Sequence, residues 1–478
     1  MSNREVLIVH GWSDTSKSFS PLVDFLRNSG FNAVDLWLGD YISLDDDVKI
    51  EDVAKRMEAL VREKLASAEI HAPFDLIVHS TGGLVARQWI STYYLDEISK
   101  CPVKRLVMLA PANFGSKLAS MGQSVLGRVL KGWNNWFHTG KEMLASLELS
   151  APFQWQLVQR DLLVPDGETD ERAVYAENGV WPFVLTGTHP YPSALRQIVN
   201  EDGADGTVRA AAANLNTRGV TIDFAVDENN PELRFWKNRS EMAFPCAILP
   251  DRTHASIIDP AAPDVKAKAA VQQRLGALIL AALNCETFAD YQQIASDWHQ
   301  ISEDTAALSG SDADREALFL DGETNPEFFH QYIQVNVQVV DDHGADVLDY
   351  MIEFSGPDWK RNDDPTVYFH REVLEHVHTN SSNAAYRCLF LDRTDLLNEF
   401  YNRIGKNVEK ILTMSISATA PGGNVAYFSN VKRGAPGEMV IHSLDDSPQA
   451  RWLQRNTTHF VRIVIPRNPS DKVFQMKH

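Results

Sequence analysis

Short apolar runs alternate with amphipathic helical stretches through the first half of the chain. The strand-like runs are Val6 to Val9, Ala33 to Leu38, Phe74 to Val78, Leu106 to Ala110 and Phe183 to Thr186, and helical periodicity covers Phe19 to Asn28 and Ile50 to about Leu65. This alternation predicts an α/β fold whose mainly parallel sheet is covered by helices on both faces.

Residues 113–174 interrupt that alternation with a helical stretch in which Trp133, Trp136 and Phe137 cluster. We interpret the segment as a lid-like or cap-like insertion over the C-terminal edge of the sheet. Its aromatic side chains either face lipid or acyl chains, or form the packed core of a cap, and the pattern favours neither alternative.

The pattern changes again in the last third of the chain. Ser302 to Pro326 is rich in Asp, Glu, Ser, Gly and Thr, which is typical of a linker. Beyond it lie the alternating runs Tyr332 to Val340, Met414 to Thr419 and Phe460 to Ile465. We therefore expect a catalytic domain over residues 1–300, a linker over 301–328 and a β-rich C-terminal domain over 329–478.

The central chemical motif is Val78-His79-Ser80-Thr81-Gly82-Gly83, directly after an apolar strand and directly before an amphipathic helix. A serine near glycine in a turn is usually structural, but strand, sharp turn and helix in this order are typical of a nucleophile elbow. The motif predicts that Ser80 is the nucleophile of a hydrolase.

A serine nucleophile needs a base, and this kind of site places the acid and then the histidine downstream of the serine. His254 fits the base, because it follows the strand-like run Ala247 to Leu249 and precedes a helix. His79 and His10 are the competitors, and we interpret both as structural. The acid is Asp205 in Asp205-Gly206-Thr207-Val208, with Asp202 as the fallback.

A tetrahedral intermediate needs backbone N–H donors for its oxyanion. Thr81 follows the nucleophile and supplies one. The amide of Trp12, in His10-Gly11-Trp12 after the first strand, is expected to supply the other.

The charge and the composition of the chain exclude some classes of binding partner and cofactor. The net charge of −19 opposes binding to nucleic acid and simple electrostatic docking on anionic membranes. The four cysteines lie far apart and no metal or phosphate-loop motif occurs, so we expect neither a metal nor a cofactor. We also expect no signal peptide and no transmembrane helix, hence a cytoplasmic or peripherally attached protein.

Five strings together resemble the PlaB-type bacterial phospholipases A, members of the α/β-hydrolase superfamily. They are His10-Gly11-Trp12-Ser13, Tyr41-Ile42-Ser43, His79 to Gly83, Leu109 to Ser116 and Asp205 to Val208. The resemblance covers most of residues 1–260 and, more loosely, the C-terminal half. It implies an α/β-hydrolase fold, phospholipase A and lysophospholipase activity, peripheral membrane contact in a bacterium and the triad Ser80, Asp205 and His254, and it leaves a homo-oligomer open.

Two alternatives stay open. The triad alone fits a neutral-lipid lipase or carboxylesterase equally well. A hydrolase-like binding protein without activity is the alternative from another class, although a serine, an aspartate and a histidine in the required order argue against it.

Overall fold

The computed structural model describes residues 4–9, 16–35, 47–121, 140–191, 200–261, 267–268, 274–319, 325–357, 364–420, 425–427, 437–447, 451–469 and 473. They belong to two compact units. The first unit takes its residues from 1–162, 170–216 and 238–330, and the second from 163–169, 217–237 and 331–478.

A six-stranded, fully parallel sheet forms the centre of the first unit. Its strands run in the order β10 (Cys246–Leu249), β6 (Trp181–Gly187), β4 (Val103–Leu109), β3 (Phe74–His79), β1 (Glu5–Val9) and β2 (Asn32–Asp35). The middle strands read as continuous apolar runs because both faces of the sheet are covered. The predicted parallel sheet is confirmed.

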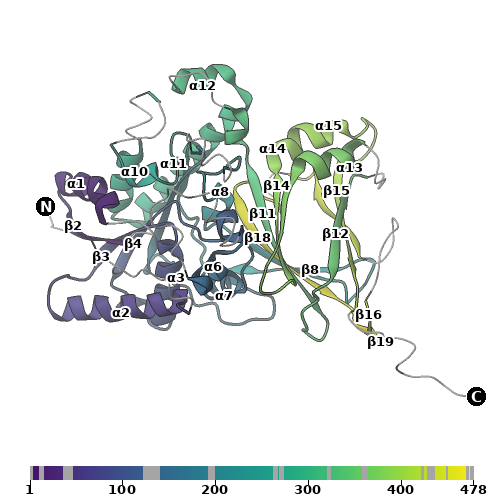
Figure 1. Cartoon of the computed structure of the whole chain (residues 1–478), viewed down its shortest axis with the longest axis horizontal. Coiled ribbons are helices and arrows are strands. Elements are labelled where there is room, and N and C mark those ends of the chain that lie inside the picture. Colours follow the sequence, from purple (N-terminus) through teal and green to yellow (C-terminus); the bar gives the residue numbers. More distant parts are fainter. Residues whose placement is uncertain are drawn as a thin grey trace, which may run out of the picture. The chain divides into compact units, whose positions relative to one another are not determined.

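Helices cover both faces of this sheet, as Figure 1 shows. On one face lie α1 (Ser20–Asn28), α10 (Arg274–Leu283) and α11 (Phe288–Ala307), and on the other α2 (Ile50–Ala66) and α3 (Gly82–Tyr93). The other helices among the described residues of the unit are α4 (Lys117–Ser120), α6 (Lys141–Leu147), α7 (Pro152–Asp161), α8 (Ala210–Ala213) and α12 (Asp312–Leu318). Because all strands are parallel, their carboxyl ends meet at one edge, where open α/β sheets place their sites.

The segment expected to be a linker is largely helical. Helix α11 begins with a capping box between Thr287 and Asp290 and continues to Ala307. The hydroxyl of Thr305 donates to the carbonyl oxygen of Ile248 on β10, at 2.8 Å. Composition suggested a linker because the solvent-facing side of this helix is acidic and polar, while its apolar side packs on the core.

The second unit is β-rich, as predicted. Its larger sheet has the order β13 (Leu374–Thr379), β14 (Tyr386–Asp392), β11 (Tyr332–Asp341), β18 (Thr457–Ile465), β7 (Arg218–Asp223) and β8 (Glu232–Phe235). An antiparallel three-stranded sheet has the order β12 (Tyr350–Ser355), β15 (Ile411–Ala418) and β17 (Glu438–Ser443). The two-residue strands in the described part of the chain are β5 (Leu163–Val164), β9 (Lys237–Asn238), β16 (Val425–Ala426) and β19 (Asn468–Pro469).

The second unit includes residues 163–169 and 217–237, which we expected in the catalytic domain. Strands β7 and β8 come from residues expected in the catalytic domain, yet β7 pairs in parallel with β18. No local signal distinguishes such strands from those of the first sheet, because their assignment depends on a partner more than 200 residues away.

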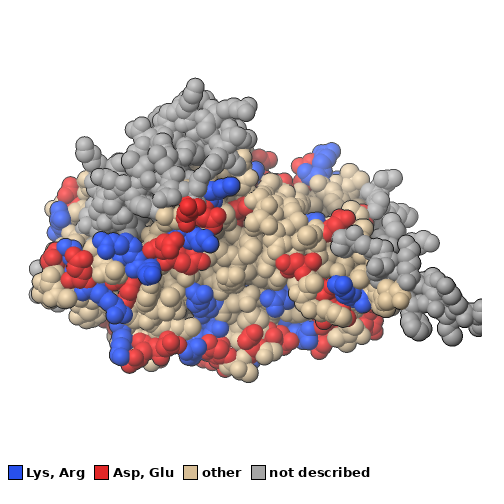
Figure 2. Space-filling model, turned by 60° about the horizontal axis from the view of Figure 1, so that its bottom comes forward, with Lys and Arg blue, Asp and Glu red and all other residues tan. Residues whose placement is uncertain are grey.

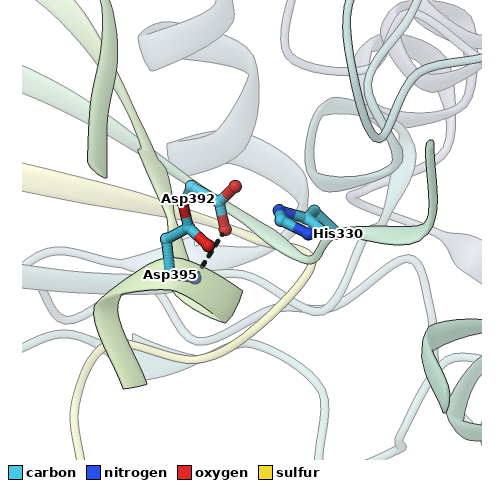
Figure 3. A group of neighbouring side chains, drawn as sticks. All are labelled: His330, Asp392 and Asp395. Atoms are coloured by element: carbon cyan, nitrogen blue, oxygen red, sulfur yellow. Dashed lines mark hydrogen bonds between the residues drawn. The ribbon is translucent and has the colours of Figure 1, made fainter. Parts of the chain in front are cut away.

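Among its described residues, the second unit also has the helices α13 (Asp364–Tyr368), α14 (Arg393–Asp395) and α15 (Tyr401–Arg403), and a π-helical stretch, Leu396–Phe400, joins the last two. Asp392 caps α14, since its carboxylate accepts a hydrogen bond from the backbone N–H of Asp395 at 3.0 Å (Figure 3). In the described ranges, no helix combines the length and the apolar character that crossing a membrane requires.

Candidate functional site

Ser80 lies in the turn between β3 and α3, at the carboxyl edge of the parallel sheet. Its φ of +53° is in the left-handed region, which a non-glycine residue adopts only when the surroundings impose it. The turn is held by a backbone hydrogen bond from the N–H of Ser80 to the carbonyl oxygen of Leu109 on β4, at 3.1 Å. The strand, turn and helix of the predicted elbow are all present.

The elbow also requires close approach between α3 and the loop after β4. A Cβ atom at Gly83 would lie only 2.8 Å from the Cβ of Pro111, well inside normal van der Waals contact. Gly83 is therefore the residue whose missing side chain lets α3 pass that loop.

His254 reaches Ser80 from the loop after β10. Its Nε2 lies 3.0 Å from the Oγ of Ser80, and its Nδ1 lies 2.8 Å from Oδ2 of Asp205. An ionised carboxylate can only accept hydrogen bonds, so Nδ1 carries the proton and Nε2 is left to accept the hydroxyl proton of Ser80. All three side chains are at most 5% exposed.

The loop around Asp205 orients its carboxylate. Oδ1 accepts backbone N–H bonds from Thr207 at 2.9 Å and Val208 at 2.8 Å, which leaves Oδ2 for the imidazole. The backbone N–H of His254 also donates to the carbonyl oxygen of Asp205, at 2.8 Å. The two loops are thus joined through both main chain and side chain, and the carboxylate at the His254 ring is that of Asp205 rather than the fallback Asp202.

His79 lies behind the histidine loop. Its Nε2 is 3.0 Å from the carbonyl oxygen of His254, and the two rings are 4.7 Å apart between centroids. The ring of Phe19 packs edge-on against it. His79 is therefore a buried neighbour of the loop that carries His254, in agreement with its structural interpretation.

The remaining expected site residues divide into two groups. Thr81 is the N-cap residue of α3, so its N–H belongs to a helix end where backbone donors have no intrahelical acceptor. Trp12 and His10 lie outside the described residues, and so do the aromatic residues of the insertion, Trp133, Trp136 and Phe137.

Sequence reasoning missed a buried ion pair that involves α3, the helix after Ser80. Arg87 on α3 makes two hydrogen bonds to Asp161 on α7, at 2.8 and 3.0 Å, and a third to the carbonyl oxygen of Asn113 after β4. Both charged side chains are 0% exposed. Burial raises the pKa of the Asp161 carboxyl, and the charge and hydrogen bonds of Arg87 oppose that rise. Arg87 is the single charged residue of α3, and this was the only local signal of the pair.

Comparisons with known proteins agree with the α/β fold of the first unit. The sequence profile described as "Alpha/beta hydrolase family" matches residues 6–265, more than half of the chain. No curated protein sequence matches significantly.

Among solved structures, phospholipase PlaB from Legionella pneumophila superposes with a TM-score of 0.77 at 24% identity, over 100% of this chain and 96% of that chain. PlaB in complex with thio-NAD superposes with a TM-score of 0.75 at 25% identity, over 99% and 96%. The mature lipase BlEst2 from Bacillus licheniformis, at 16% identity, covers 54% of this chain and 87% of its own with a TM-score of 0.34.

The similarity to PlaB extends across both units, which confirms the resemblance expected from the sequence and the order of an α/β-hydrolase fold followed by β-rich sheets. The chain belongs to the alpha/beta hydrolase family.

Proposed function

We propose that this protein is a serine hydrolase that cleaves acyl esters of glycerophospholipids and lysophospholipids, with Ser80, His254 and Asp205 as its catalytic triad. The observation that carries the proposal is the continuous hydrogen-bonded series from Ser80 Oγ through the His254 ring to Asp205 Oδ2. The phospholipid specificity is supported by the full-length similarity to PlaB, a phospholipase.

The reaction follows from this geometry. His254 Nε2 accepts the proton of Ser80 as its oxygen attacks the ester carbonyl, and Asp205 stabilises the imidazolium that forms. The N–H of Thr81 donates to the oxyanion. His254 then gives the proton to the departing alcohol, which leaves an acyl-enzyme on Ser80. Water, deprotonated by His254, attacks that ester and releases the fatty acid and the free serine.

We further propose that contact with the lipid surface is peripheral. On the face that Figure 2 shows, Lys and Arg side chains are interspersed with Asp and Glu and separated by uncharged surface. With a net charge of −19, attraction to anionic lipid is weak overall. We expect sedimentation with phosphatidylcholine vesicles that increasing salt does not reduce, and loss of binding in salt would instead indicate an electrostatic contact.

The test of function is fatty-acid release from phosphatidylcholine and lysophosphatidylcholine by the wild type, Ser80→Ala and the matched control Ser91→Ala. Ser91 is another buried serine, on α3, whose hydroxyl bonds to the carbonyl oxygen of Gln88. We expect release by the wild type and the control, and only background release by Ser80→Ala.

Two other outcomes would contradict the proposal. Activity on short p-nitrophenyl esters without fatty-acid release from either lipid would show that the protein is a carboxylesterase and not a phospholipase. Undiminished release by Ser80→Ala would exclude Ser80 as the nucleophile.

A further inference from the structure

The second unit contains a cavity of about 100 Å³ between its six-stranded and its three-stranded sheet. One wall is formed by alternate residues of the six-stranded sheet, such as Val335 and Val337 on β11 and Val461 and Ile463 on β18. Because neighbouring residues of a strand point to opposite faces, these positions share one face of the sheet. The opposite wall comes from β12, β15 and β17.

Every described residue that lines the cavity is apolar. A sugar, a nucleotide or a phosphate placed there would lose its water without gaining hydrogen bonds, which is strongly unfavourable. A single water needs roughly 10 to 15 Å³ of such space, so the cavity has room for more than one water molecule. Met414 and Met439 lie in the lining, and their flexible side chains adapt to a ligand's shape.

The cavity opens between two edge strands. Leu233 and Phe235 on β8, and Val440 on β17, line it and are also 44%, 58% and 50% exposed. Strand β8 ends the larger sheet and β17 ends the smaller one. Edge strands usually carry charged or short side chains that prevent aggregation with other chains. A large apolar rim on two edge strands therefore indicates a binding function.

We propose that this cavity binds the acyl chain of a single-chain lipid such as a free fatty acid. The chain enters between β8 and β17, and the polar head group stays in water outside the apolar rim. Such a ligand matches a lining of apolar side chains and an opening to solvent at one side. The proposed site is separate from Ser80 and does not rest on the catalytic function.

Trp452 makes the proposal testable, because it lines the cavity. Bromine quenches tryptophan fluorescence on contact, so mid-chain brominated palmitic acid should quench Trp452 when bound. The matched control is Trp236, which packs against Arg462 and hydrogen-bonds to Thr221 at 2.9 Å. Thr221 and Arg462 alternate with cavity-lining residues, so Trp236 lies on the opposite face of the same sheet.

The titration uses full-length Ser80→Ala protein, so that catalysis plays no part. We expect saturable quenching that unbrominated palmitic acid reverses, that persists in Trp236→Phe and that disappears in Trp452→Phe. The conservative Trp452→Phe substitution keeps the site apolar, so this variant should still bind radiolabelled palmitic acid.

A second pair of variants tests whether palmitic acid occupies the cavity. Val335→Trp fills the cavity from a partly buried position, and Val377→Trp adds the same side chain at an exposed position on β13 outside the lining. The first should raise the apparent Kd for palmitic acid by about tenfold or more, and the second should leave it unchanged. Absence of saturable quenching, equal quenching in Trp452→Phe, or unaltered affinity in Val335→Trp would each overturn the proposal.

Discussion

Replacing Asp205 by asparagine tests the proposed triad at the residue that the local sequence identified least directly. In the structure, Oδ1 of Asp205 accepts two backbone N–H bonds and Oδ2 accepts the proton on Nδ1 of His254. An amide has only one oxygen. Keeping that oxygen on the N–H groups of Thr207 and Val208 preserves two hydrogen bonds, so the amide NH₂ must face His254.

The NH₂ group can donate to Nδ1 only when Nδ1 carries no proton. The imidazole then holds its proton on Nε2, 3.0 Å from Ser80 Oγ, and cannot accept the serine proton. An analogous change in another serine hydrolase lowers kcat by about 10⁴-fold, which corresponds to roughly 5 kcal/mol of transition-state stabilisation. We expect a loss of that size in Asp205→Asn.

The measurement is kcat and kcat/KM on a p-nitrophenyl ester, together with the rate of labelling by a fluorophosphonate. The backbone hydrogen bond from the N–H of His254 to the carbonyl oxygen of Asp205 does not involve the substituted side chain, so the fold should persist. Thermal unfolding of Asp205→Asn checks this, with a destabilisation of about 1–3 kcal/mol expected.

The control is Asp202→Asn, which changes the half-buried aspartate of the same loop and should leave both rates near the wild-type value. If Asp202→Asn lost activity while Asp205→Asn retained it, the hydrogen-bonded series described above would not be the catalytic one.

Three further predictions concern stability. Gly83→Ala should destabilise the protein by about 1–3 kcal/mol, because its Cβ would meet Pro111 at 2.8 Å, and an unchanged Tm would refute this. Arg87→Met should cost about 3–5 kcal/mol in thermal unfolding, since it leaves the Asp161 carboxylate buried without its partner, and Asp161→Leu added to it should restore much of the loss. Burial lowers the pKa of His442 from its ordinary value of 6.5 to about 4. Between those values the unfolded chain binds a proton that the folded chain does not, so His442 should remove roughly 3 kcal/mol of stability as pH falls from 6.5 to 4, and His442→Gln should flatten this dependence.

The sequence alone determined the features that depend on near neighbours in the chain. The apolar run from Phe74 to Val78, with a serine and two glycines soon after it, predicted strand β3, a sharp turn and helix α3. Strand ends in a parallel sheet share one edge, so the loops holding Asp205 and His254 could be placed near Ser80 before any distance was known. These inferences need only hydrophobic periodicity, turn chemistry and chain order.

The tertiary structure decided the features that depend on partners far apart in the chain. Asp202 and Asp205 both fit the acid, and only the folded loop shows which carboxylate reaches the imidazole. Strand β7 belongs to the second unit because β18, more than 200 residues later, pairs with it. The acidic stretch after residue 301 is largely helical, because the apolar side of α11 packs on the core of the first unit. Composition and periodicity show which side chains of a segment are apolar and can be buried. The partner surface against which they pack exists only once the whole chain has folded.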